Sequence, residues 1–233
     1  MKIALLGYGK MGKTIEKLAT EKGHSIVARV GSDSNYSGIE EADTAIEFST
    51  PEAVIKNLET CFNLNIPVVC GTTGWLDKKD EMLKKCQAGN GSFIYASNFS
   101  VGVNIFFALN KKLAEMMSDH KDYNVSIEEI HHTQKLDAPS GTAITLAEGI
   151  IENSDYKNWK LDRADENEIP VKAIRKDDVK GTHIIAYKSE IDTLSISHEA
   201  HTRDGFALGA ILAAEWLQNK QQGIYTMSDV LGL

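Results

Sequence analysis

The stretch KIALLGYGKMG, residues 2–12, decides the fold of the first part of the chain. Its apolar start is typical of a parallel strand covered on both faces, and residues 13–23 have the apolar spacing of a helix. Between them lies the pattern G-x-G-x-x-G. The first glycine permits a tight turn, the second lets the backbone approach a pyrophosphate, and the third allows close packing of helix on strand. The stretch therefore predicts a dinucleotide-binding turn; a glycine-rich turn without a ligand is the alternative.

Strands and helices are predicted to alternate over about the first hundred residues. Short apolar runs indicate further strands at 24–30, 44–49, 66–71 and 92–97, with helices at 50–65 and 75–90. Thr50 and Pro51 suit the N-cap and the first position of the helix that they begin. This alternation predicts an α/β fold, a Rossmann-type doubly wound parallel sheet.

The pattern changes after residue 100. A long amphipathic helix is predicted for 101–120, an alternating strand for 123–132, a helix for 142–153 and a two-stranded hairpin for 181–200. Residues 153–170 are polar and show no strong period. We therefore expect a second, α+β domain on a mixed or antiparallel sheet. A last helix is predicted for 204–220, and its periodicity leaves open which domain it joins.

Composition excludes several classes of function. The 233 residues carry a formal net charge of −8, which argues against a nucleic-acid or anionic-membrane partner, since both favour a basic surface. The three cysteines lack the spacing of a metal site and are expected to be buried, reduced thiols. The first residues are predicted to form a strand and not a signal peptide, and no apolar run approaches a membrane span. We therefore expect a cytoplasmic protein.

The acid that a dinucleotide fingerprint expects about twenty residues after the glycines is displaced here. Its place falls near Val30 and Gly31, and the nearest carboxylate is Asp33. This weakens a strict preference for NAD and leaves room for a 2′-phosphate. Lys10 and Lys13 are candidate phosphate partners, with solvated helix lysines as the alternative interpretation. The choice between NADH and NADPH stays open.

Two further loops follow predicted parallel strands, at the edge where open α/β sheets bind ligands. CGTTGW, residues 70–75, offers small side chains and backbone donors at Gly71, Thr72 and Thr73, and ASNFSVG, residues 96–102, follows the next strand. Either loop could instead be a simple connection between strand and helix.

HHTQKLDAPSGT, residues 131–142, gathers proton-transferring groups at the end of a strand. His131 and His132 would point to opposite faces of a regular strand, so both reach one site only if the strand ends or bends there. Histidine titrates near neutral pH, and a lysine such as Lys135 can be tuned by neighbouring cations. A purely structural histidine is the alternative.

The end of the same segment predicts an anion site. Ser140 suits a helix N-cap, and Gly141 and Thr142 would present free amides and a hydroxyl to a carboxylate. A plain capping motif is the alternative. Combined with the histidines and Lys135, this predicts a site for an anion that also receives a proton. The remaining histidines suggest no metal, and His24, His120 and His183 are expected at the surface or at the ends of elements.

The segment EEIHHTQKLDAPSGTA, residues 128–143, strongly resembles the signature of the 4-hydroxy-tetrahydrodipicolinate reductase (dihydrodipicolinate reductase) family. Four other segments look like family segments in the same order: FSTPEAV (48–54), VVCGTTGW (68–75), ASNFSVGVN (96–104) and HEAHTRDGFALGA (198–210). The resemblance implies NADH- or NADPH-dependent reduction of a cyclic, unsaturated dicarboxylate imine in lysine and diaminopimelate biosynthesis, by a homotetramer. It also implies a dinucleotide domain of residues 1–100 plus 204–233 and a substrate and oligomerisation domain of residues 101–203.

Residue roles follow from the same resemblance. It places the proton donor and acceptor on His131 and a proton-donating lysine on Lys135. Substrate contacts are implied for His132, Ser140, Gly141 and Thr142. Cofactor contacts are implied for Gly7, Tyr8, Gly9, Lys10, Met11, Gly12, Gly71, Thr72, Thr73, Ser97, Asn98, Phe99 and Ser100, with Asp33 as the displaced acid.

The chain departs from the family pattern in its short glycine turn, in Gly31 near the place of the acid, and in Gln134, where a basic residue is common. Two rival interpretations remain: an aspartate- or homoserine-type dehydrogenase with the same nucleotide domain, and an NAD(P)-sensing regulator. The regulator would need a DNA-binding or partner segment, and the sequence shows no basic helix of that kind.

Overall fold

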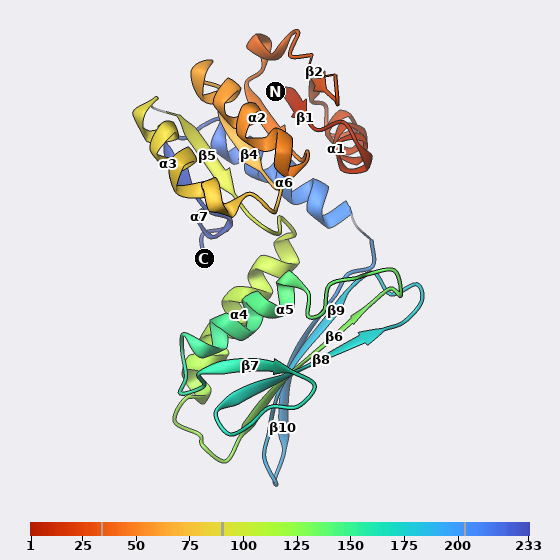
Figure 1. The fold of residues 1–233 in the computed structure, drawn as a ribbon, viewed down its shortest axis with the longest axis vertical. Helices are drawn as coiled ribbons and strands as arrows, with labels where there is room; N and C mark the ends of the chain where they lie inside the picture. Colours follow the sequence, from red (N-terminus) through yellow and green to blue (C-terminus); the bar gives the residue numbers. More distant parts are fainter. Residues whose placement is uncertain (34, 90, 203) are drawn as a thin grey trace. The chain divides into compact units, whose positions relative to one another are not determined.

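The computed structural model describes residues 1–33, 35–89, 91–202 and 204–233, which form two compact units (Figure 1). Unit 1 combines residues 1–101 with 204–233, and unit 2 consists of residues 102–203. The C-terminal helix, whose place periodicity left open, belongs to unit 1. No helix within the described ranges is long and apolar enough to cross a membrane.

Unit 1 is built on a six-stranded parallel sheet of the predicted kind. Its strands are β1 (Lys2–Leu6), β2 (Ser25–Val30), β3 (Thr44–Glu47), β4 (Val68–Cys70), β5 (Ser92–Tyr95) and β11 (Gly223–Tyr225). They lie in the order β11-β5-β4-β3-β1-β2, with every neighbouring pair parallel. Strand β11 is an addition that the sequence analysis missed, because three residues are too few to show a period.

Helices cover both faces of this sheet, which confirms the doubly wound arrangement. On one face, α1 (Lys10–Glu21), α6 (Asp204–Leu217) and α7 (Met227–Leu231) pack against Ile3, Leu5 and their neighbours. On the other, α2 (Pro51–Asn63) and α3 (Lys79–Ala88) pack against Ala4 and Leu6. Two short 3₁₀ turns, η1 (Ile39–Glu41) and η2 (Leu76–Lys78), lie in the connections.

The helix starts follow the predicted capping residues with one correction. Helix α2 has Thr50 at its N-cap and Pro51 at its first position, and α5 has Ser140 at its N-cap, as predicted. Helix α1 begins at Lys10, three residues earlier than predicted, with Gly9 as its N-cap. Gly12 therefore lies inside the first helical turn, where it packs directly against the end of β1.

Unit 2 holds a five-stranded mixed sheet in the order β10-β9-β6-β8-β7. Its strands are β6 (Asn124–His131), β7 (Asn158–Leu161), β8 (Glu168–Arg175), β9 (Thr182–Lys188) and β10 (Thr193–Glu199). Strand β6 runs parallel to β8 and antiparallel to β9, and the predicted hairpin is β9 with β10. Helices α4 (Val101–Met117) and α5 (Gly141–Ile151) share one apolar core with the sheet.

Strands β7 and β8 lie where the sequence analysis found no strong period or predicted no element. Strand β7 is an edge strand with mostly exposed residues, so it shows little apolar alternation. In β8, Ile169 and Val171 are fully buried, but Pro170 between them is a residue that strands usually exclude. The parallel pairing of β8 with β6 brings Arg175 beside His131.

The three cysteines, Cys61, Cys70 and Cys86, are buried and free, as predicted. Burial raises the pKa of each thiol, so these side chains act as core residues in unit 1.

Candidate active site

The glycine turn of unit 1 is shaped by backbone contacts. Gly7 has a φ of 100°, and a Cβ at this position would lie 2.0 Å from the carbonyl oxygen of Phe48. A Cβ at Gly12 would lie 2.2 Å from the carbonyl oxygen of Gly7. The first and third glycines are therefore required by the close approach of β1, β3 and α1.

The second glycine has a different environment. Gly9 is exposed, and nothing in the described part of the chain lies within 4 Å of the place that its Cβ would take. Helical hydrogen bonding in α1 begins with the Lys13 amide, which donates to the carbonyl of the N-cap residue Gly9 at 3.1 Å. The amides of Lys10, Met11 and Gly12 precede it and have no such acceptor. Open space beside free helical amides fits the pyrophosphate of a dinucleotide.

Tyr8 belongs to a charged cluster that the sequence analysis missed. Its hydroxyl donates to Glu16, and Arg29 donates through Nε to both oxygens of the same carboxylate, at 3.0 and 3.1 Å. The hydrogen bond to Glu16 raises the pKa of Tyr8. Lys13 and Arg29 also lie near the Tyr8 ring, at 6.0 and 5.9 Å from its centroid. Asp33 is exposed, and its carboxylate accepts from the Asn35 amide at 3.4 Å, within its own turn.

The loops after β4 and β5 are only partly available to a ligand. The Thr72 hydroxyl accepts the Ser49 amide at 2.8 Å, whereas Thr73 is exposed. Asn98 accepts the Ser100 amide at 2.9 Å, and Phe99 is buried in the core of unit 1. Gly71 and Ser97 lie between these groups in the two loops, and Phe99 could offer a cofactor only its backbone.

The histidine segment of unit 2 begins where β6 ends. Strand β6 stops at His131, and His132 starts a turn in which its carbonyl accepts the Lys135 amide at 3.1 Å. His131 is almost buried, while His132 is half-buried. The strand therefore ends between the two histidines, which is one of the two geometries that would allow both to serve one site.

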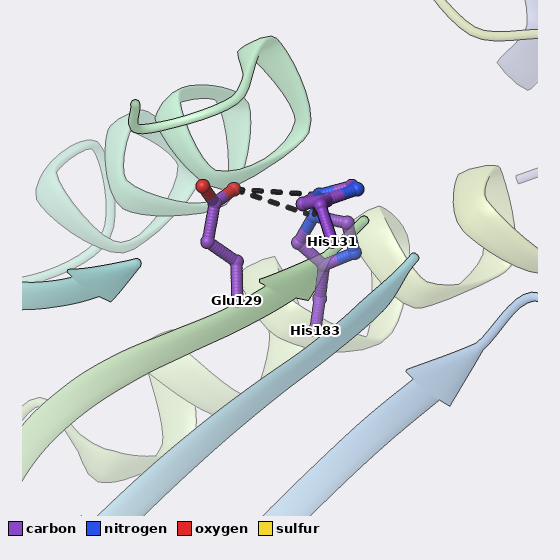
Figure 2. Close-up of side chains that lie close together, drawn as sticks. All are labelled: Glu129, His131 and His183. Atoms are coloured by element: carbon purple, nitrogen blue, oxygen red, sulfur yellow. Dashed lines mark hydrogen bonds and ion pairs between the residues drawn. The ribbon is translucent and has the colours of Figure 1, made fainter. Parts of the chain in front are cut away.

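Three side chains meet at this end of the sheet: Glu129 and His131 from β6 and His183 from β9 (Figure 2). The Glu129 carboxylate points toward both imidazole rings, with Oε2 at 3.6 Å from His131 Nε2 and 3.8 Å from His183 Nε2. The two Nε2 atoms lie 3.3 Å apart. His183 is the second residue of β9 and is 4% exposed, so of the two expected places, the surface or the end of an element, the end of an element is correct. Its burial was missed because a histidine near a strand start looks like any residue at the end of an element.

Glu129 is a fully buried anion. Arg175 Nη2 donates to its Oε1 at 3.1 Å, and the Ser140 amide donates to its Oε2 at 2.9 Å. Burial acts to raise the pKa of this carboxyl, but His131 and Ser140 outweigh burial and lower it to about 2. Burial lowers the pKa of His183 to about 4, and His131 adds to this effect. Near neutral pH, Glu129 is therefore charged and His183 is neutral.

Lys135 has an anionic partner that the sequence analysis did not consider. Its Nζ lies 2.8 Å from both carboxylate oxygens of Asp137, and this contact lowers the pKa of Asp137. Arg175 also holds the loop, because its Nε donates to the Lys135 carbonyl at 3.3 Å and its Nη2 to the Asp137 carbonyl at 2.6 Å. The positive field of the loop is thus smaller than the expected lysine and histidines alone would produce.

Helix α5 begins beside the cluster, and its cap decides which amides a ligand can use. The Ser140 hydroxyl accepts the Ala143 amide at 3.2 Å and lies 3.2 Å from His183 Nε2. Because the Ser140 amide already donates to Glu129, the amide and the hydroxyl of this serine both have protein partners. The amides of Gly141 and Thr142 are the first-turn donors that remain, and Gly141 is exposed. An anion would therefore bind at Gly141 and Thr142, with Ser140 holding the helix start.

A metal ion could also bridge this cluster, because one ligand atom each from Glu129, His131 and His183 lies within 4.8 Å of the other two. Their hydrogen bonds give a sufficient reason for this spacing, since Arg175 and Ser140 bind both Glu129 oxygens. A divalent cation would lie close to the Arg175 guanidinium, which opposes its binding.

Both units match models of known protein families. Residues 1–99 match the family model for the N-terminus of dihydrodipicolinate reductase, and residues 102–231 match the model for its C-terminus. The chain is 56% identical to the 4-hydroxy-tetrahydrodipicolinate reductase of Christiangramia forsetii, over 99% of this chain and 98% of that one. It is 36% identical to the enzyme of the same name from Rickettsia bellii, over 95% and 90%.

The fold has a solved counterpart as well. The structure of dipicolinate-bound dihydrodipicolinate reductase from Paenisporosarcina sp. TG-14 superposes with a TM-score of 0.78 at 22% identity, covering 97% of each chain. At this identity the likeness shows the shared fold, and the two family models carry the assignment.

Proposed function

Since the chain belongs to the dihydrodipicolinate reductase family, we propose that it reduces 4-hydroxy-tetrahydrodipicolinate to tetrahydrodipicolinate with NADH or NADPH, in lysine and diaminopimelate biosynthesis. The observation that carries the proposal is the segment 131–142 of unit 2, which joins His131 and Lys135 to the open amides of α5. This combination suits an anionic substrate that must be protonated during its reduction.

Unit 1 would hold the dinucleotide. The exposed Gly9 and the amides of Lys10, Met11 and Gly12 would bind the pyrophosphate, with Tyr8 beside them. Gly71, Thr72 and Thr73, with Ser97 to Ser100, line the same carboxyl edge of the sheet. The bound cofactor supplies a hydride from its nicotinamide ring.

Unit 2 would hold the substrate. We assign one carboxylate to the amides of Gly141 and Thr142, with His132 and Lys135 as further partners. The similar solved structure binds dipicolinate, a planar ring with two carboxylates, which supports a dicarboxylate in this role. Orienting the ring by its carboxylates would lower the entropic part of the barrier to hydride transfer.

His131 would act as the proton donor and acceptor and Lys135 as a proton donor. Both groups belong to the segment that holds the carboxylate, so a proton can reach the negative charge left on the ring when the hydride is added. Lys135 can use its bidentate contact with Asp137 to keep Nζ in one place until substrate binds.

We also propose that the chain works as a homotetramer in the cytoplasm, with unit 2 providing the contacts between copies. The hairpin of β9 and β10 supports this assignment, since Ile191 is 90% exposed and Leu194 is 44% exposed. Exposed apolar groups on an edge hairpin favour association. Light scattering of the purified chain, at several concentrations, measures the mass directly.

The activity is tested by mixing the purified chain with enzymatically generated substrate and following NADPH and NADH absorbance separately. We expect oxidation of at least one coenzyme that depends on substrate. His131→Ala and Lys135→Ala should each lower kcat by about 10² to 10⁴-fold, because each removes a proton donor. For His131→Ala the KM for substrate should change by less than about threefold, since its loss removes chemistry more than binding.

Wild-type turnover in either variant would contradict the assigned roles. Substrate-dependent oxidation that appears with aspartate semialdehyde or oxaloacetate plus ammonia, but not with the cyclic substrate, would favour the rival dehydrogenase classes. Binding of NADPH without turnover of any of these substrates would favour the regulator.

A further inference from the structure

We propose that Glu129 and His183 are positioning residues that hold His131 by its Nε2 atom, so that the proton for reduction leaves from Nδ1. This inference rests on the proposed function, because it concerns the proton that accompanies hydride transfer. It assigns roles to a buried acid and a buried histidine that have no part in binding substrate or cofactor.

The first observation is the direction of the His131 ring. Its contacts with other described side chains run through Nε2, which lies 3.3 Å from His183 Nε2 and 3.6 Å from Glu129 Oε2. The edge of the ring that carries Nδ1 and Cε1 faces Gly181. A Cβ at Gly181 would lie 3.2 Å from His131 Cε1 and 3.4 Å from Nδ1, so a side chain at this position would crowd Nδ1.

The second observation is that His183 can adjust its proton to that of His131. Its Nε2 contacts His131 and the Ser140 hydroxyl, whereas its buried Nδ1 has no hydrogen-bond partner among the residues that the structure describes. No second bond therefore fixes its tautomer. Neutral His183 can therefore carry its hydrogen on Nδ1 and accept a hydrogen bond at Nε2 from the Nε2–H of His131, both before and after His131 loses its Nδ1 proton.

The third observation is the rigidity of Glu129. Arg175 and the Ser140 amide bind its two oxygens, and the residue is fully buried, so the carboxylate cannot swing away from the rings. An anion 3.6 Å from Nε2 stabilises a hydrogen on that nitrogen, so Nδ1 is the ring nitrogen that remains to give up a proton. The same contacts join the proton donor to the start of α5, where the substrate carboxylate is assigned.

Hydride addition brings two electrons to the substrate ring and leaves a negative charge on it. The Nδ1–H bond of His131 then breaks, its electron pair stays on Nδ1, and the proton bonds to the charged atom of the substrate. His131 keeps its hydrogen on Nε2, facing His183 and Glu129, until solvent returns the lost proton.

Several charged or titratable groups surround His131, and each belongs to an element packed at this end of the sheet. They are Glu129 on β6, Arg175 on β8, His183 on β9, His198 on β10, and Lys135 and Asp137 in the loop. Glu129 is the acid nearest to Nε2 among these groups. A change of Glu129 alone is therefore expected to move the pH at which the His131 ring takes up its proton.

The experiment compares the full chain with Glu129→Gln, and uses Glu128→Gln as a matched control. Glu128 is the neighbouring residue on β6 and pairs with Lys172 at 3.0 Å, outside the cluster. We expect Glu129→Gln to lower kcat about 10 to 100-fold at pH 7 with KM changed less than about threefold. Its pH–rate limb should move toward lower pH by about one unit, since the charge that favours protonation is gone. The control should match the wild type.

Nuclear magnetic resonance gives a readout that does not need turnover. In ¹⁵N-labelled protein, the ring nitrogens of His131 report the pH of protonation and the tautomer, and spectra of His131→Ala assign the signals. We expect the protonation midpoint to fall in Glu129→Gln and not in Glu128→Gln. Failure of the proposed function would appear as an inactive wild type with this shift still present.

If Glu129→Gln does not fold, a pair of substitutions at His183 tests the contact between its Nε2 and that of His131. His183→Leu should lower kcat about tenfold, whereas His183→Gln should recover to within about threefold, because a glutamine amide can occupy the place of Nε2. Equal losses in both variants would overturn the proposal. So would a Glu129→Gln enzyme that loses kcat at every pH without a shifted limb, or stoichiometric Zn²⁺ binding by the wild type that His183→Leu abolishes.

Discussion

The glycine turn after β1 and the loop after β6 are built for ligands in opposite ways. In the turn, free amides and an exposed glycine face the expected dinucleotide, and added atoms at Gly7 or Gly12 would collide with backbone at 2.0 or 2.2 Å. In the loop, charged side chains dominate, and a buried carboxylate connects an arginine, two histidines and a helix start. One region depends on shape and the other on charge.

This difference predicts how each region responds to change. The turn should tolerate altered pH and charge but not an added methyl group at Gly7 or Gly12, because backbone atoms cannot move away as flexible side chains do. The loop should tolerate a methyl group at Gly141, where nothing in the described chain lies within 4 Å, but not a change in charge.

Gly7→Ala should cause the largest loss of stability. The Cβ would lie 2.0 Å from the Phe48 carbonyl oxygen, and a φ of 100° is strained for alanine. We expect the free energy of unfolding to fall by more than about 3 kcal/mol, measured by urea denaturation. Gly23→Ala is the matched control, because its φ is 84° but its Cβ would meet nothing within 4 Å in the described structure. It should cost only about 1 kcal/mol, and equal losses would contradict the steric argument.

Acid should destabilise the fold through the buried groups beside the loop. Burial lowers the pKa of His183 from 6.5 to about 4, so in this range the unfolded chain binds a proton that the folded chain does not. Stability should therefore fall as the pH drops from about 6.5 to 4, by up to about 3 kcal/mol. Glu129, whose pKa is lowered from 4.5 to about 2, extends the loss below pH 4.5, because its charge stabilises the fold only while it persists.

His183→Gln separates these contributions. It should remove the loss of stability between about pH 6.5 and 4 and keep the loss that Glu129 causes below pH 4.5. Urea denaturation at pH 7, 5.5 and 4.5 should show a flatter dependence in His183→Gln than in the wild type, by up to about 1.4 kcal/mol per pH unit. Parallel slopes would show that His183 is not the residue that resists protonation in the fold.

The fold of unit 1 could be predicted from the sequence because its signals are local. Glycines at a strand end and Pro51 at a helix start act within a few residues, and both were placed correctly. The missed elements, β7, β8 and β11, lack such signals. Strand β7 is polar, β8 contains Pro170, and β11 has three residues, so sheet pairing and not local preference decides them.

The candidate site divides in the same way. His131, Lys135 and the start of α5 lie within twelve residues of sequence, so their proximity could be predicted. His183 and Arg175 reach the cluster only through the pairing of β9 and β8 with β6. Because β8 was not predicted, the arginine that binds Glu129 could not be inferred. The burial of His183 could not be inferred either, because the pairing of β9 with β6 was not predicted.

The smallest expected effects come from adding one methyl group at each open glycine. Gly9→Ala should raise the Kd for NADPH about tenfold, because the new Cβ occupies space assigned to the pyrophosphate, while stability changes by less than about 1 kcal/mol. Gly141→Ala should raise the KM for substrate about threefold, because its Cβ lies beside the amides assigned to the carboxylate, and leave the Kd for NADPH unchanged. Fluorescence titration with NADPH and steady-state kinetics separate the two effects, and each variant is the control for the other. If Gly141→Ala weakened NADPH binding as strongly as Gly9→Ala, the division of ligands between a shape-dependent turn and a charge-dependent loop would be wrong.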